Sequence, residues 1–163
     1  MTALKNLGWC CAAFLLLATA FSAPAQQAND KDKKNAEKIP PVKEVRTSAE
    51  AVKMAAAIDL PLIKKADKIV LEQLDEFGAK TGKKVTLDKR EPIAKLTETL
   101  KPKAVAEIGA AASVRITFYQ GDQTLRTIYV IEELGNWWIE RPKMNWATGQ
   151  DPALWKAIKP HLK

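Results

Sequence analysis

The stretch SVRITFYQGDQTLRTIYVIEELGNWWIER, residues 113–141, decides the fold class, because it has the pattern of three consecutive antiparallel strands. Apolar residues alternate with more polar ones in its first part, which places one set on each face of a sheet. The pair Gly121-Asp122 suits a two-residue hairpin turn, and a second turn is expected at Leu134-Gly135. The stretch therefore predicts a three-stranded meander.

The first turn also predicts a register for the hairpin. With Gly121 and Asp122 at its centre, the cross-strand pairs are Tyr119–Thr124, Phe118–Leu125, Ile116–Thr127 and Val114–Tyr129. A slip by one residue would set Phe118 opposite Arg126, and burial of the apolar set argues against that pairing. The second strand contains the unbroken apolar run 128–131, which is typical of a strand inside a sheet and covered on both faces.

The rest of the chain supplies helices and a second hairpin. The elements are expected in this order: a helix after a capping box at Thr47 and Glu50 that Pro61 ends, strands at 68–75 and 84–87, a helix over 89–100, the meander, and a last helix from Asp151. This order predicts an α+β fold, in which helices pack on an antiparallel sheet of about five strands.

The N-terminal residues are typical of an export signal. Residues 1–25 carry one lysine, an apolar run too short for a membrane span, and the small-x-small site Ala23-Pro24-Ala25. We expect a signal peptide here, with an uncleaved signal anchor as the alternative. Residues 26–46 are predicted to be a disordered linker and residues 47–163 a single domain. The mature protein would be secreted or periplasmic and not an integral membrane protein.

Cysteines are confined to the predicted signal peptide, at Cys10 and Cys11. The mature chain would therefore have neither a disulfide nor a thiolate metal site. His161 is the single histidine, so we expect no catalytic triad, no metal and no cofactor.

The pattern ADKIVLEQLDEFG, LTETLKP and ITFYQGDQTLRTIYVIEE, within residues 66–133, resembles small exported bacterial domains of uncharacterised function. This resemblance implies a stand-alone domain behind a signal peptide. It implies no activity and no functional residues.

The charge is basic, with 26 Lys and Arg against 19 Asp and Glu and a formal net charge of +7. A lysine-rich solvated surface explains this balance, and adhesion to anionic cell-envelope polymers or lipid head groups is the alternative. Nucleic acid is not an expected partner, because an exported protein rarely meets it and the chain has no basic stripe with interleaved aromatic residues.

The predicted register also suggests a binding surface. It places six residues on one side of the meander, namely Arg115, Thr117, Tyr119, Arg126, Trp137 and Arg141. Guanidinium groups beside aromatic rings can hold a carboxylate, a phosphate or a sugar acid. The alternative is that these arginines pair with Glu132 and Glu140, or cover Ile128 and Val130 with their stems. Trp137 and Trp138 should point to opposite faces, so that one of them joins the core.

The favoured interpretation is a non-enzymatic exported domain that binds or inhibits an anionic envelope component or another protein. A small carboxylate-dependent hydrolase is an alternative, because acidic residues cluster at the strand ends: Asp67, Glu72, Asp75 and Glu76, and then Glu132, Glu133 and Glu140. A structural or stress-related periplasmic protein is the third possibility.

Overall fold

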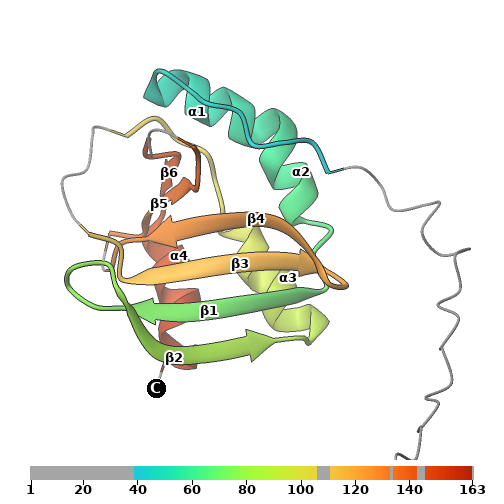
Figure 1. Ribbon diagram of the computed structural model, residues 1–163, viewed down its shortest axis with the longest axis vertical. Helices are drawn as coiled ribbons and strands as arrows, with labels where there is room; N and C mark the ends of the chain where they lie inside the picture. The colour runs from blue at the N-terminus through green and yellow to red at the C-terminus, as the bar shows by residue number, and fades with distance from the viewer. Residues whose placement is uncertain (1–38, 106–110, 133, 143–145, 163) are drawn as a thin grey trace, which may run out of the picture. The chain divides into compact units, whose positions relative to one another are not determined.

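The computed structural model describes residues 39–105, 111–132, 134–142 and 146–162, which belong to one compact unit. Figure 1 shows an antiparallel sheet with the strand order β2-β1-β3-β4-β5-β6. The strands are β1 (Lys68–Leu74), β2 (Lys80–Leu87), β3 (Val114–Gln120), β4 (Gln123–Val130), β5 (Asn136–Ile139) and β6 (Gly149–Gln150). The helical elements are α1 (Ser48–Met54), η2 (Ala55–Asp59), α2 (Leu60–Ile63), α3 (Arg90–Glu98), α4 (Pro152–Ile158) and η3 (Lys159–His161).

The predicted α+β class is confirmed, with six strands in place of about five. The additional strand, β6, has two residues and pairs with β5, so it is too short to produce an alternation that a sequence could show. β2 begins at Lys80, four residues before the predicted start at Lys84.

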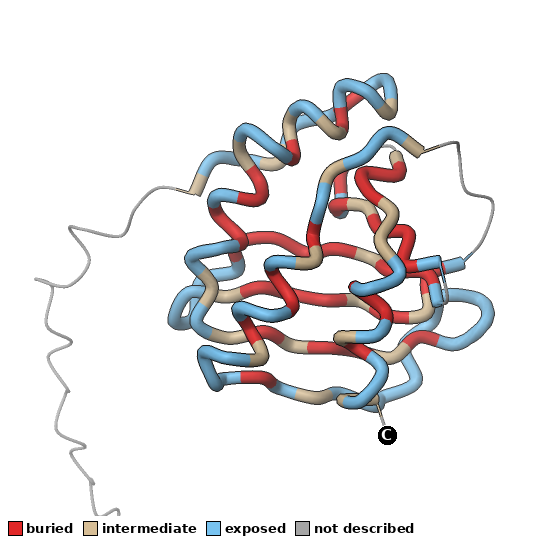
Figure 2. The backbone as a smooth tube through the Cα atoms, turned by 180° about the vertical axis from the view of Figure 1, so that it is seen from behind, coloured by how far each residue is buried: buried red, intermediate tan, exposed pale blue. Residues whose placement is uncertain are grey.

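The described helices contribute to one core, on one face of the sheet. α3 and α4 lie behind the strands in Figure 1 and in front of them in Figure 2. The buried side chains on this side include Ile116, Phe118 and Ile128 from the sheet, and Leu96 and Leu154 from the helices. We call this side of the sheet the covered face and the opposite side the open face.

The N-terminal helix passes through Pro61, although the sequence predicted that this residue would end it. Thr47 caps its start, because Oγ1 accepts a hydrogen bond from the Glu50 N–H at 3.1 Å. The five residues before Leu60 form a π-helical turn, in which the Leu60 N–H donates to the carbonyl of Ala55. This wider turn accommodates the proline, which lacks an N–H and would clash with a carbonyl in a regular α-helix.

The register of the β3–β4 hairpin changes at a β-bulge. Tyr119 pairs with Thr124 as predicted, but Phe118 then lies opposite Arg126, the pairing that the prediction rejected. The additional residue is Leu125, which is itself buried. Beyond the bulge, Ile116 pairs with Ile128 and not with Thr127, so the apolar residues still share one face. The prediction was wrong because it treated the strand as regular.

β4 lies inside the sheet as predicted, but the described helices cover only one of its faces. Tyr129 is on the other face and is half-buried by its neighbours within the sheet. The prediction that helices or other elements cover the apolar run 128–131 on both faces was therefore wrong for the described part of the chain.

Packed structure begins earlier in the chain than predicted. Residues 39–46, here called the strap, run back along the N-terminal helix in Figure 1. Val45 is only 1% exposed, and Ile39 and Val42 pack against the core. The predicted linker thus extends too far, because Ile39, Val42 and Val45 pack on the folded domain. The predicted signal peptide and the rest of the predicted linker lie outside the described residues.

Within the described part of the chain, no helix has both the length and the apolar character that crossing a membrane requires.

Candidate functional site: the open face of the sheet

A row of cross-strand neighbours runs over five strands of the open face. Lys84 of β2 lies opposite Glu72 of β1, and the row continues through Arg115 of β3, Tyr129 of β4 and Trp138 of β5. Directly opposed residues in a sheet point to the same side and have closely spaced Cβ atoms. Register alone therefore places two cations, one acid and two aromatic rings in one line.

Glu72 is the ionic centre of this row. It is 5% exposed, although it lies on the face that the described helices leave uncovered. Its Oε2 is 3.4 Å from Arg115 Nη1, and its Oε1 is 3.3 Å from Lys84 Nζ, with Lys80 Nζ also within 3.8 Å of Oε2. Three basic side chains thus surround one buried carboxylate.

Arg115 connects this cluster to a second carboxylate. Its Nη2 is 3.7 Å from Oε2 of Glu140, the residue that follows β5. The guanidinium therefore lies between Glu72 and Glu140. This arrangement agrees with the alternative that the sequence left open, in which an arginine of the meander pairs with Glu140.

Tyr129 and Trp138 form the aromatic part of the site. Their ring centroids are 5.6 Å apart and the rings are inclined by 17°, an offset stack across β4 and β5. The Tyr129 hydroxyl donates to Oε1 of Glu140 at 3.1 Å. Burial, and then the negative charge of Glu140 and this hydrogen bond, raise the pKa of Tyr129 above its usual value.

Three of the six predicted binding residues lie on the open face. They are Arg115, Thr117 and Tyr119, at alternating positions on β3. Thr117 is buried between its neighbours, and the ammonium of Lys68 lies over the Tyr119 ring, 5.0 Å from the centroid. Lys68 is in turn 3.8 Å from Asp122 in the hairpin turn.

The other three predicted residues do not belong to this surface. Arg126, Trp137 and Arg141 are all buried on the covered side. The Leu125 bulge reverses the direction of Arg126, because one additional residue moves every following side chain to the opposite face. The sequence prediction also placed Trp137 on the binding side of the meander, and this placement was wrong. Trp137 is the one in the core, and Trp138 is half-exposed.

Arg126 and Arg141 have a structural role around Asp59, which is on the π-helical turn and 1% exposed. Arg126 Nε donates to Oδ1 of Asp59 at 2.5 Å, and Arg141 Nη2 donates to Oδ2 at 2.9 Å. The two guanidiniums also hold the strap, by bonds to the carbonyls of Pro40 and Lys43. We call Asp59, Arg126 and Arg141 the buried charge cluster.

The sequence prediction left Glu72, Tyr129 and Trp138 out of this surface, and it named Glu140 only as a partner for the arginines. The same alternation that identified Arg115 could have found them, had it been extended from β3 to the strands on either side. Asp59 gave no such signal, because its partners Arg126 and Arg141 are 67 and 82 residues away in the chain.

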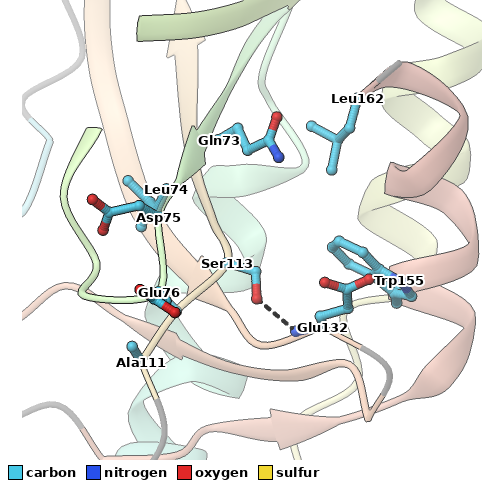
Figure 3. Close-up of a pocket in the computed structure, with 10 residues that line it drawn as sticks. Gln73, Leu74, Asp75, Glu76, Ala111, Ser113, Glu132, Trp155 and Leu162 are labelled. Carbon is cyan, nitrogen blue, oxygen red and sulfur yellow. Dashed lines mark hydrogen bonds between the residues drawn. The ribbon is translucent and has the colours of Figure 1, made fainter. Parts of the chain in front are cut away.

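Some of the carboxylates that the hydrolase alternative requires meet at one end of the sheet. Asp75, Glu76 and Glu132 line a hollow beside Trp155 (Figure 3). Asp75 has a role in its own turn, because Oδ1 accepts hydrogen bonds from the N–H groups of Phe77 and Ala79. Glu133 lies outside the described residues. No group of three or more His, Cys, Asp or Glu among the described residues is arranged to hold a metal ion.

Comparison with known proteins gives no relative: no family model, no curated protein and no solved structure matches the chain.

Proposed function

We propose that the chain is an exported, non-enzymatic binding domain whose open face binds an acidic glycan of the cell envelope. The observation that carries this proposal is the Tyr129–Trp138 stack, half-exposed on a sheet face that no described helix covers and flanked by charged side chains. The proposed export rests on the signal-like pattern of residues 1–25.

A glycan suits the aromatic part of this face. A sugar ring has an apolar C–H surface that can lie on an aromatic ring, and hydroxyl groups around its edge that need hydrogen-bond partners. Glu140 and Arg115 are next to the stack and can supply both acceptors and donors.

Acidic groups on the glycan suit the lysines of the same face. Lys80 and Lys84 have side chains that are 60% and 57% exposed, so each can reach a ligand from its position beside Glu72. Arg115 is less available, because Glu72 and Glu140 already surround its guanidinium. We therefore assign Arg115 to positioning the two carboxylates, and the lysines to attracting the ligand.

The test is a calorimetric titration of the purified protein with an acidic oligosaccharide, such as a hexauronate, and with a neutral oligosaccharide of equal length. We expect saturable binding of the acidic one and at least tenfold weaker binding of the neutral one. Trp138→Ala should abolish binding, and Lys84→Ala should weaken it about fivefold, consistent with one exposed charge contact near 1 kcal/mol.

Lys95→Ala is the matched control, because Lys95 is an exposed lysine of α3, the helix on the opposite side of the sheet. The Lys95→Ala protein should bind the acidic oligosaccharide with the same affinity as the unmodified protein. Equal binding of the neutral and acidic oligosaccharides, or full binding by the Lys84→Ala protein, would exclude the proposal.

The hydrolase is the second candidate, because Glu76 and Glu132 line the same hollow. It predicts that the oligosaccharide is cleaved during the titration, and that Glu132→Gln stops the cleavage. Product analysis by chromatography separates the two candidates, since a binding domain returns the oligosaccharide intact.

A further inference from the structure

The row of cross-strand neighbours on the open face runs across the strands and not along them. From Lys84 on β2 to Trp138 on β5, each member lies directly opposite the next, so the row is continuous over four strand spacings. Neighbouring strands are about 4.8 Å apart, which gives the row a length of about 19 Å. Figure 1 shows these strands side by side, with the described helices on their other face.

The two ends of this row differ in charge. At the β2 end, the side chains of Lys80 and Lys84 are mostly exposed, whereas the carboxylate of Glu72 that they contact is buried. At the aromatic end, the exposed charge is that of Glu140, whose side chain is 47% exposed and accepts the hydrogen bond of the Tyr129 hydroxyl. A ligand that covers the whole row therefore meets positive charge at one end and a carboxylate at the other.

This difference decides which part of a glycan suits each end. A carboxylate on a sugar at the Tyr129–Trp138 stack would lie near the carboxylate of Glu140, and like charges at close range repel each other. A neutral sugar avoids this repulsion, and its hydroxyl groups can donate hydrogen bonds to Glu140. At the other end of the row, a carboxylate would be attracted by two ammonium groups.

We propose that the ligand lies across the strands, with a neutral sugar on the Tyr129–Trp138 stack and an acidic sugar at Lys80 and Lys84. This placement rests on the proposed glycan binding and narrows the ligand to a mixed glycan, in which the acidic sugar is separated from the stacked one. A pyranose in an extended chain has about the length of one strand spacing, so a tetrasaccharide spans the row.

The experiment compares oligosaccharides of two lengths by calorimetric titration. Cellotetraose and cellobiose are each used unmodified and with the non-reducing glucose oxidised to glucuronic acid. We expect oxidation to raise the affinity of the tetrasaccharide at least fivefold. Oxidation should not raise the affinity of the disaccharide, because its carboxylate cannot reach the lysines while a sugar lies on the stack.

The number of carboxylates gives a second comparison. Tetraglucuronic acid carries a carboxylate on every sugar, so it also places one beside Glu140. It should bind more weakly than the singly oxidised tetrasaccharide, although its total charge is higher. Glu140→Gln removes the negative charge and should reduce or abolish this difference between the two ligands.

Two lysine variants locate the acidic sugar. Lys84→Ala should reduce the affinity for the singly oxidised tetrasaccharide about fivefold, the effect of one exposed charge contact, and should not change the affinity for cellotetraose. Lys68→Ala is the matched control, because it removes the same charge from the same face. Lys68 lies over the Tyr119 ring, at the other end of β1 from Glu72, and so it is outside the row.

The crosswise placement and the proposed glycan binding fail in different ways. The placement is wrong if oxidation strengthens the disaccharide as much as the tetrasaccharide, or if Lys68→Ala weakens binding as much as Lys84→Ala does. In either case the protein still binds acidic glycans. If none of these oligosaccharides binds saturably, both proposals are wrong.

Discussion

Arg126 donates a hydrogen bond of 2.5 Å from Nε to Oδ1 of Asp59, a residue 67 positions earlier in the chain, and both side chains are buried. The carboxylate of Asp59 is shared with Arg141, whose Nη2 bonds to the other oxygen. The buried charge cluster thus connects the N-terminal helix, β4 and the residues after β5. It encloses ionic groups in the interior, where an unpaired charge is costly.

Asp59→Asn tests how strongly the fold depends on this cluster. The substitution keeps the size of the side chain but leaves two buried guanidiniums without a carboxylate, so we expect a loss of about 3–5 kcal/mol in the free energy of unfolding. Urea denaturation followed by circular dichroism measures it. Asp88→Asn, at an exposed position before α3, should change stability by less than about 0.5 kcal/mol. Equal midpoints for the two variants would show that the cluster contributes nothing.

Removal of the strap should destabilise the domain. A chain that starts at Thr47 loses the burial of Val45 and the carbonyl acceptors of Pro40 and Lys43, whereas one that starts at Ile39 keeps them. The burial of one valine and the bonds to two charged groups together predict a difference of about 3 kcal/mol or more. Urea denaturation of the two truncated proteins measures it. If their unfolding curves coincide, the strap is not part of the folded domain.

The raised pKa of Tyr129 predicts that the folded protein loses stability in alkaline solution. Its pKa is raised in the folded state, first by burial and then by Glu140, so the folded protein holds the phenolic proton more strongly than the unfolded chain does. This contribution is fully present below the unfolded pKa, about 10, and is lost as the pH rises through the higher folded pKa. The Tyr129→Phe protein should therefore lose less stability than the unmodified protein between pH 9 and pH 12.

The titration of Tyr129 can be observed directly, because the chain has only two tyrosines. In the Tyr119→Phe protein, the ultraviolet absorbance of phenolate reports Tyr129 alone. Its midpoint should lie above that of the same protein unfolded in urea, and Glu140→Gln should lower it. A midpoint that does not change on unfolding would contradict the environment described for this residue.

Gly149→Ala tests the packing of Trp137 against β6. A methyl group at this position would overlap the indole nitrogen of Trp137 and the carbonyl of Lys101, and neither can move freely in the interior. We expect a loss of about 1–3 kcal/mol from overpacking, measured by thermal unfolding. Gly121→Ala is the comparison, because there the added methyl group meets no neighbour and only backbone strain contributes. Gly121 has a φ of +58° and open space around it, so the Gly121→Ala substitution should lower the free energy of unfolding by only about 1 kcal/mol.

The sequence predicted those features that depend on regular alternation. The faces of Arg115, Thr117 and Tyr119 follow from the period of two along β3, and the opposite orientation of Trp137 and Trp138 follows from the same period along β5. Arg126 was misplaced because the Leu125 bulge leaves no mark in a pattern where Leu125, Arg126 and Thr127 are all buried.

The misjudged helix end has a related cause. Pro61 ends a regular α-helix, but a π-helical turn permits the chain to continue, and no local residue preference announces that turn. Asp59, the last residue of this turn, was missed as a member of the buried charge cluster. Its partners come from β4 and from the residues after β5, and pairing over such sequence distances is set by tertiary structure.

The attachment of the strap determines how the domain would bear a load. The strap is held by Arg126, which belongs to β4, a strand with neighbours on both sides. Tension applied to the chain before Ile39 would thus be transmitted through the bond between Arg126 and Pro40 to the middle of the sheet, and would not peel an outer strand away. A domain connected in this way resists being pulled open from its N-terminal side.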